Sequence, residues 1–241
     1  MEIIKVKDYQ DMSREACSLL VDTINKKPNS VLGLATGSTP EGLYQQLIKK
    51  YQQKEVSFQQ AKTFNLDEYV GIASDDPNSY YYFMNEKLFN HIDIQKGNTH
   101  IPNGMAEDMD QECRDYEQLI RKAEHMDIQL LGLGLNGHIG FNEPGTPLTS
   151  RTHIVELDES TRMANARFFN TMNEVPKKAI TMGIDTIMES KKIMLLVSGE
   201  KKAGAVKRLV DGDITEEFPA SILQKHHDVT VIADEAALLE I

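Results

Sequence analysis

Residues 128–144 read IQLLGLGLNGHIGFNEP, a short apolar run followed by a polar stretch rich in glycine. The run Ile128–Gly132 is typical of a strand that is covered on both faces in a parallel sheet. Glycine and proline recur too often from Gly134 to Pro147 for a helix, so we expect an irregular loop. Because α/β enzymes keep their chemistry at the carboxyl ends of strands, His138 and its polar neighbours are candidate functional residues.

A dinucleotide-binding site is one alternative for this stretch. Gly132, Gly134 and Gly137 match the pattern G-x-G-x-x-G, and Glu156 or Asp158 follows about twenty residues later, where a ribose-binding acid would stand. In that fingerprint, however, the third glycine opens a helix whose N-terminus faces the pyrophosphate. A loop follows here instead, which favours a reaction site shaped by the glycines.

The composition of the chain limits its class and its partners. It has 241 residues, of which 40% are hydrophobic, and a formal net charge of −11. This length allows a substantial core, and we expect residues 1–241 to form a single domain. The acidic balance, without a stripe of Lys and Arg, argues against a nucleic-acid partner.

The same survey bears on the cellular context. No apolar stretch approaches the roughly 18 residues of a membrane span, and the first residues lack the charge bias of a signal peptide. Cys17 and Cys113 are far apart and form no C-x-x-C or Cys/His cluster, which is typical of reduced packing residues. We therefore expect a cytoplasmic protein with no membrane partner.

Strand-like and helix-like patterns alternate along nearly the whole chain, which predicts an α/β fold with an open, mostly parallel sheet and helices on both faces. The predicted strands are Ile3–Val6, Val31–Ala35, Ala61–Leu66, Ile128–Gly132, His153–Leu157, Lys192–Val197 and Val229–Ala233. The predicted helices are Tyr9–Lys26, Pro40–Gln53, Ser79–Asn90, Met109–His125, Glu159–Phe169, Glu200–Val210 and a terminal turn from Glu235.

A loop with a candidate binding role follows the strand Val31–Ala35. It contains Thr36, Gly37, Ser38 and Thr39, and we expect Thr39 to cap a helix in which Pro40 takes the first position. Backbone N–H groups, hydroxyls and the positive end of a helix dipole would then meet at one spot, which suits a phosphate. An ordinary helix cap explains the loop equally well.

Two further positions are candidates for acid–base chemistry. The strand Ala61–Leu66 delivers Asp67 to the carboxyl edge of the sheet, where burial could tune a carboxylate, although adjacent acids are more often solvated turn residues. His138 has a carboxylate five residues away at Glu143 and an amide at Asn136. A carboxylate beside an imidazole fixes its tautomer. A metal site is the alternative, but no third ligand follows at zinc-like spacing.

Basic residues that could meet an anion lie late in the chain. Arg162 and Arg167 belong to the stretch 161–169, and Lys202 stands near a predicted helix start. Most such side chains are solvated, but a cation at a helix N-terminus is disfavoured by the dipole unless an anion also binds there.

Four stretches, taken in order, resemble the glucosamine-6-phosphate deaminase family over nearly the whole chain. They read LGLATGSTP at 32–40, FNLDEY at 64–69, NGHIGFNEP at 136–144 and ANARFF at 164–169. The resemblance implies a modified Rossmann-like three-layer sandwich and the conversion of D-glucosamine 6-phosphate and water to D-fructose 6-phosphate and ammonia. It implies no metal and no organic cofactor.

The resemblance also assigns roles to residues of this chain. Asp67 would remove the C2 proton of the opened sugar and return a proton at C1. His138 would open the ring by moving a proton between O1 and O5, with Glu143 and Asn136 orienting it. The Thr36–Thr39 backbone, Arg167 and Lys202 would hold the phosphate and so position the sugar. The segment between about His153 and Pro176 would act as a lid.

This chain departs from the family pattern at two places. Some relatives have Asp where this chain has Asn136, so a neutral amide replaces a carboxylate beside the imidazole and we expect activity with an altered pH profile. Allosteric hexameric relatives carry basic residues at the positions of His153 and Val155 and a longer C-terminal tail than one ending at Ile241. We therefore expect a monomer or small homo-oligomer that N-acetylglucosamine 6-phosphate does not activate.

Two other functions remain open at this point. A related sugar-phosphate enzyme, such as a 6-phosphogluconolactonase or a pentose-phosphate isomerase, would share the fold, but a lactonase needs no base over C2 and so no Asp67. A non-catalytic sugar-phosphate sensor would not need Asp67, His138 and Glu143 together.

Overall fold

The computed structural model describes residues 1–166, 169 and 171–241, and its centre is a seven-stranded sheet in the order β1-β10-β9-β6-β2-β3-β5. All neighbouring strands in this sheet run parallel. Its strands are β1 (Glu2–Val6), β2 (Val31–Leu34), β3 (Lys62–Asn65), β5 (Thr99–His100), β6 (Ile128–Gly132), β9 (Ile193–Val197) and β10 (Val229–Asp234). The expected mostly parallel sheet is confirmed.

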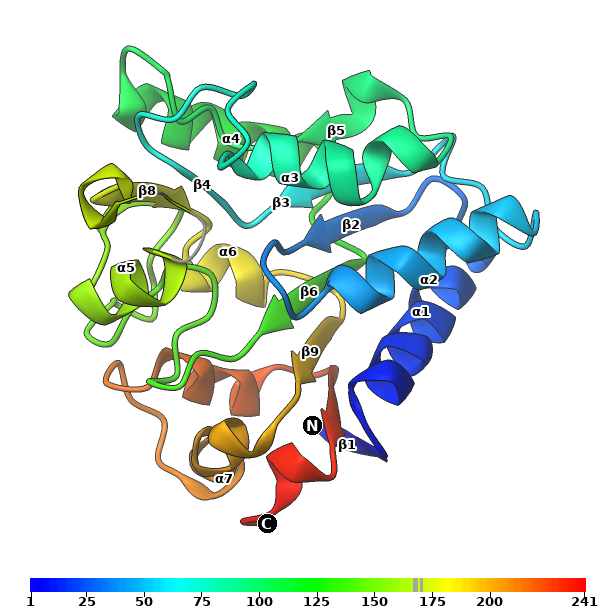
Figure 1. The fold of residues 1–241 in the computed structure, drawn as a ribbon, viewed down its shortest axis with the longest axis vertical. Coiled ribbons are helices and arrows are strands. Elements are labelled where there is room, and N and C mark those ends of the chain that lie inside the picture. The colour runs from blue at the N-terminus through cyan, green and yellow to red at the C-terminus, as the bar shows by residue number, and fades with distance from the viewer. Residues whose placement is uncertain (167–168, 170) are drawn as a thin grey trace.

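Helices cover the sheet from both sides, with α1 and α2 on one side and α6 and α7 on the other (Figure 1). The α-helices are α1 (Tyr9–Lys26), α2 (Glu41–Gln52), α3 (Tyr80–Lys87), α4 (Met109–Lys122), α5 (Glu159–Asn165), α6 (Ile184–Met188) and α7 (Ala203–Asp211). Short 3₁₀ helices are η1 (Phe89–His91), η2 (Lys96–Asn98), η4 (Met172–Glu174), η5 (Glu200–Lys202), η6 (Pro219–Lys225) and η7 (Ala236–Leu238). This arrangement is the expected three-layer sandwich.

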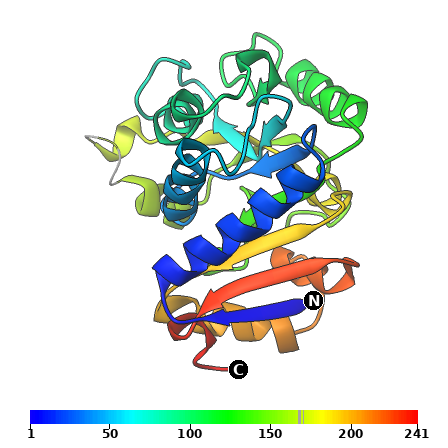
Figure 2. The ribbon, with the colours of Figure 1, turned by 90° about the vertical axis from the view of Figure 1, so that its right-hand side faces the viewer.

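The longest helix shows why the local sequence folds as it does. Asp8 caps α1 by accepting a hydrogen bond from the backbone N–H of Asp11. Met12, Ala16 and Leu20 recur at helical spacing and are fully buried against the sheet. In Figure 2, α1 crosses the sheet, and β1 lies beside β10 at the edge where both termini are found.

A second, smaller sheet stands beside the first and is antiparallel. It consists of β4 (Asp67–Tyr69), β8 (Lys178–Thr181) and β7 (His153–Glu156), in that order. The sequence predicted β7 as a strand within the alternating α/β pattern, but β7 belongs to this antiparallel sheet. The elements β4, β5, β8 and α6 were not predicted from the sequence. Each has only two to five residues, so its local pattern is too short to be distinctive.

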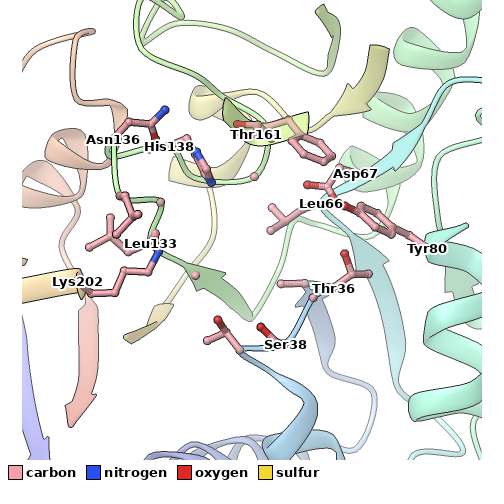
Figure 3. Close-up of a pocket in the computed structure, with 18 residues that line it drawn as sticks. Thr36, Ser38, Leu66, Asp67, Tyr80, Leu133, Asn136, His138, Thr161 and Lys202 are labelled. Carbon is pink, nitrogen blue, oxygen red and sulfur yellow. Dashed lines mark hydrogen bonds between the residues drawn. The ribbon is translucent and has the colours of Figure 1, made fainter. Parts of the chain in front are cut away.

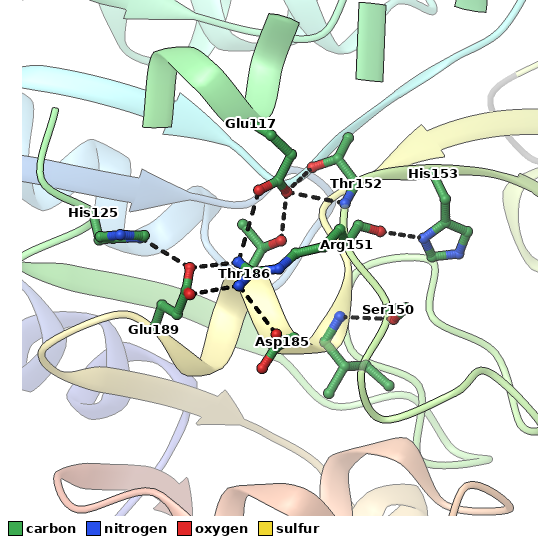
Figure 4. A network of polar contacts seen from close by, with 10 residues as sticks. Glu117, His125, Ser150, Arg151, Thr152, His153, Asp185, Thr186 and Glu189 are labelled. Atoms are coloured by element: carbon green, nitrogen blue, oxygen red, sulfur yellow. Dashed lines mark hydrogen bonds and ion pairs between the residues drawn. The ribbon is translucent and has the colours of Figure 1, made fainter. Parts of the chain in front are cut away.

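A polar network holds the chain between α4, β7 and α6 (Figure 4). Glu117 is buried and accepts hydrogen bonds from the backbone and hydroxyl of Thr152 and from the hydroxyl of Thr186. Beside it, Arg151 pairs with both oxygens of Glu189 and lies 3.1 Å from Asp185. The network therefore joins the residues that lead into β7 to α4 and α6.

No helix in the part of the chain that the structure describes is long and apolar enough to cross a membrane.

Candidate active site

A cavity of about 470 Å³ opens at the carboxyl ends of β2, β3 and β6. Most of the site residues expected from the sequence line it: Thr36, Gly37, Ser38, Thr39, Asp67, Asn136, His138 and Lys202. Figure 3 shows Thr36 and Ser38 across the cavity from Asn136 and His138. Loops that are far apart in the sequence therefore meet, as the parallel sheet predicts.

The loop after β6 has the irregular shape that its glycines predict. The N–H of Gly134 donates to the carbonyl of His138, and Gly137 has a φ of +88°. A Cβ added to Gly134 would lie 2.5 Å from the His138 ring, so the imidazole packs directly against this glycine. Because no helix follows Gly137, the dinucleotide-binding alternative does not fit this stretch.

His138, Glu143 and Asn136 form one hydrogen-bonded group. The Nδ2 of Asn136 donates to Oε2 of Glu143 at 2.8 Å, and the Nδ1 of His138 lies 3.5 Å from the same oxygen. The Oδ1 of Asn136 accepts a hydrogen bond from the backbone N–H of His138. With its Nδ1 on the carboxylate side, the imidazole keeps Nε2 for proton transfer.

Glu143 is held as a carboxylate despite being only 8% exposed. Burial raises the pKa of Glu143, but hydrogen bonds from His138, Thr161 and Asn136 favour the charged form more strongly and lower the pKa overall. The imidazole therefore faces a charged partner at neutral pH.

Asp67 is the opposite case. It follows the end of β3, as expected, but lies in β4, where it pairs with Thr181 of β8, and it is 7% exposed. Burial, and next the charge of Glu68, raise the pKa of Asp67 to about 8. Glu68 itself accepts hydrogen bonds from the backbone N–H group of Tyr69 and from those of Tyr80 and Tyr81, which begin α3.

The strand β8 brings the His138 loop to Asp67. The backbone N–H of Phe141 donates to the hydroxyl of Thr181, and Asn142 donates to the carbonyls of Ile139 and Met182. Asn142 is fully buried, so this attachment is shielded from water. The two candidate proton-transfer groups are thus fixed to one piece of backbone.

Most of the residues predicted to bind a phosphate lie along this cavity. Thr36–Thr39 and Lys202 line the cavity, and Nζ of Lys202 donates to the carbonyl of Leu133 at 2.5 Å. Burial lowers the pKa of the Lys202 ammonium group. Arg167 lies outside the described residues.

The predicted cap of α2 is wrong. Pro40, not Thr39, is the N-cap residue, and it has no side-chain oxygen to offer. The hydroxyl of Tyr9, on α1, instead accepts the Gly42 N–H and donates to the carbonyl of Ser38. Contact between α1 and the start of α2 therefore supplies the cap that was expected from Thr39.

Comparison with known proteins agrees with the fold. The model of the family described as glucosamine-6-phosphate isomerases/6-phosphogluconolactonase matches residues 7–232. The chain belongs to this family.

Individual relatives are similar over their full lengths. A glucosamine-6-phosphate deaminase from Oceanobacillus iheyensis is 58% identical over 100% of this chain and 96% of its own. Glucosamine-6-phosphate deaminase 1 from Bacillus subtilis is 55% identical over 98% of both chains. The solved structure of a monomeric glucosamine-6-phosphate deaminase is 54% identical, with a TM-score of 0.98 and all of both chains covered.

A solved 6-phosphogluconolactonase from Thermotoga maritima is 18% identical, with a TM-score of 0.77 over 97% of this chain and 99% of its own. At this identity the likeness extends to the fold alone.

The cavity is also lined by residues that the sequence did not mark as candidates. Thr161 and Tyr80 both line the cavity. Thr161 donates from its hydroxyl to Oε1 of Glu143 at 2.5 Å, and the Tyr80 ring stacks on Phe141 with centroids 6.1 Å apart. No local signal marks either residue, because each acquires its neighbour only through folding.

Among the described residues, no group of three or more His, Cys, Asp or Glu side chains is arranged to hold a metal ion.

Proposed function

We propose that this chain is a glucosamine-6-phosphate deaminase of amino sugar catabolism, converting D-glucosamine 6-phosphate and water to D-fructose 6-phosphate and ammonia. The observation that carries the proposal is the shared cavity, in which Asp67 and His138 face the same space as Thr36–Thr39 and Lys202. Full-length relatives at 58% and 55% identity bear this name.

Ring opening is the first step and is assigned to His138. Its Nε2 takes the proton of the O1 hydroxyl and gives one to O5, so the C1–O5 bond breaks and C1 becomes an aldehyde. The Glu143 carboxylate stabilises the imidazolium formed during this transfer, while Asn136 keeps that carboxylate in place.

Isomerisation and hydrolysis follow at C1 and C2. Asp67 removes the C2 proton and O1 gains a proton from the ammonium group on C2, which gives an enolamine; a proton returned from Asp67 to C1 then leaves a protonated imine at C2. Water adds to this imine and ammonia leaves. Every step is a proton transfer or the hydrolysis of an imine, so the proposal requires neither a metal nor an organic cofactor.

The phosphate supplies binding energy remote from the reacting carbons. We assign its contacts to the Thr36–Thr39 loop, to Lys202 and, by sequence alone, to Arg167. Cationic and hydroxyl donors that bind the phosphate, away from C1 and C2, position the sugar without taking part in the proton transfers.

No observation favours the 6-phosphogluconolactonase alternative. Hydrolysis of a lactone has no use for a carboxylate held to remove a C2 proton, and solved lactonases share only the fold with this chain.

Release of ammonia tests the function directly. The wild type and Asp67→Asn are assayed for ammonia and fructose 6-phosphate formed from glucosamine 6-phosphate, and for hydrolysis of 6-phosphogluconolactone. We expect deamination by the wild type, near-complete loss in the variant with substrate affinity retained, and no lactonase activity. Lactone hydrolysis without ammonia release would overturn the proposal.

We further propose a monomer or small homo-oligomer without an allosteric activator. His153, at a position where allosteric relatives carry a basic residue, donates a hydrogen bond from its Nδ1 to the carbonyl of Arg151 at 2.8 Å, and Val155 has no charge. Addition of N-acetylglucosamine 6-phosphate should leave the half-saturating substrate concentration unchanged. A large change would contradict the proposal.

Two wider expectations stay proposals. A single domain over residues 1–241 is supported by the larger of two core clusters, whose members extend along the chain from Met12 to Ala237. A cytoplasmic location is supported by Cys17 and Cys113, which are free and buried, as in proteins of reducing compartments.

A further inference from the structure

Thr161 is attached to the catalytic group from an element that carries none of the assigned catalytic residues. It lies on α5, is 7% exposed and lines the cavity opposite Thr36 and Ser38 in Figure 3. Its hydroxyl donates to Oε1 of Glu143 at 2.5 Å. A short bond between buried groups is strengthened by their low-dielectric surroundings.

The contact divides the two oxygens of Glu143 between different partners. Oε1 receives the hydroxyl of Thr161, whereas Oε2 receives Asn136 and faces Nδ1 of His138. The terminal torsion of a glutamate is broad, so the residue by itself does not fix which way its carboxylate turns. A donor on each side fixes the rotation and directs Oε2 to the imidazole.

The position of α5 is set independently of Glu143. Arg162, the next residue, donates through its guanidinium to the backbone carbonyls of Pro176, Val175 and Met172. These bonds join α5 to the chain that returns toward β8. The fold, rather than the contact with Glu143, therefore determines where the Thr161 hydroxyl lies.

We propose that Thr161 is a positioning residue for ring opening, which orients the Glu143 carboxylate and thereby couples the placement of α5 to His138. The inference rests on the proposed deaminase function. It assigns Thr161 no contact with substrate; its effect passes through Glu143.

The hydroxyl also acts on the charge of its partner. Hydrogen bonds from His138, Thr161 and Asn136 oppose the effect of burial on the Glu143 carboxylate, and among the described residues His138 is the titratable group that faces it. Asp67 and Lys202 line the same cavity. Loss of the hydroxyl should therefore raise the pKa of Glu143.

The test compares Thr161→Val, which has nearly the same shape without the hydroxyl, with Thr161→Ser, which retains the hydroxyl. We expect Thr161→Val to lower kcat about tenfold with KM within twofold of the wild type, and to raise the pKa of Glu143. Thr161→Ser should restore both. Met163→Ala, at a side chain 59% exposed on the same helix, should behave as the wild type.

A second measurement does not depend on activity. The Glu143 carboxyl carbon is followed by NMR as pH is varied in wild type, Thr161→Val and Thr161→Ser. A higher midpoint in the valine variant alone supports the proposal, even if the wild type releases no ammonia and the deaminase function itself fails. Equal midpoints in all three proteins, or equal kinetic losses in the serine and valine variants, would overturn it.

Discussion

Thr181 accepts a hydrogen bond from the backbone N–H of Phe141 at 3.1 Å while standing opposite Asp67 in the β4–β8 pair. One residue of a short strand thus joins the loop that carries His138 to the backbone that carries Asp67. Their relative placement depends on β8, whose own neighbours are β4 and β7 of the smaller sheet.

Thr181→Val should loosen this junction. The valine keeps the shape but leaves the buried Phe141 N–H without its acceptor, at a cost of about 1–3 kcal/mol in the free energy of unfolding. We also expect kcat to fall several-fold because Asp67 and the His138 loop lose their common anchor. Urea denaturation and the ammonia assay measure the two effects.

Thr63→Val is the matched control for that experiment. Thr63 is equally buried, on β3, and its hydroxyl oxygen has no hydrogen-bond partner among the described residues. Removing an unpaired buried hydroxyl should leave the free energy of unfolding unchanged or raise it. Equal losses in the two variants would show that shape, not the Phe141 bond, is what matters.

Gly134→Ala should displace the imidazole. An added Cβ would lie 2.5 Å from atoms of the His138 ring, so the ring must leave its present position, in which Nδ1 lies 3.5 Å from Glu143. Misplacing a proton-transfer group by about 1 Å lowers kcat about 10²-fold. Gly97→Ala, where the added Cβ meets nothing within 4 Å, is the control and should retain full activity in the same assay.

The pKa of Asp67 gives activity a definite pH dependence. A base must be ionised to take a proton, and burial with the neighbouring Glu68 raises the pKa of Asp67 to about 8. We expect kcat/KM to increase as pH rises through that value. A profile that is flat between about pH 6 and 9 would contradict the assignment of Asp67 as the base.

The same shift predicts that Asp67→Asn stabilises the protein. The pKa of Asp67 is higher in the folded state, so between about pH 4 and 8 the native protein keeps a proton that the unfolded chain has lost. The free energy of unfolding of the wild type therefore falls as pH rises through this window. Urea denaturation should show little difference between the proteins near pH 4 and an advantage for Asp67→Asn near pH 8. A difference that does not change with pH would refute this.

Arg151→Met tests the polar network of Figure 4. The Arg151 guanidinium lowers the pKa of Glu189, so this pair contributes above the ordinary glutamate value of 4.5 and its contribution is lost as pH falls through the lowered pKa. Both side chains are about one-third exposed, so we expect a loss of only about 1 kcal/mol at pH 7.

The comparison for Arg151→Met is Lys178→Met, which removes an exposed pair with Glu156 at 3.7 Å. Solvent screening should make that substitution nearly neutral in urea denaturation. The prediction fails if the gap between wild type and Arg151→Met stays constant down to about pH 3, below the ordinary glutamate range.

Much of the fold follows from local patterns. The predicted helix Tyr9–Lys26 is α1 to the residue, and the predicted strand Ile128–Gly132 is β6. A helical spacing of apolar residues and a continuous apolar run can both be recognised in the sequence without knowledge of distant contacts. The prediction for the cap of α2 was wrong because the oxygen that accepts the N–H of Gly42 in its first turn belongs to Tyr9 on another helix.

The sequence by itself determined which segments form most of the helices and parallel strands, and which loops carry candidate functional residues. These features depend on hydrophobic periodicity and on the positions of glycine and proline, which act over a few residues. Only the tertiary structure decided that β8 joins Asp67 to the His138 loop and that Thr161 meets Glu143. Such contacts link residues 18 to 114 positions apart, so burial and pairing across the folded chain, rather than any local preference, bring them together.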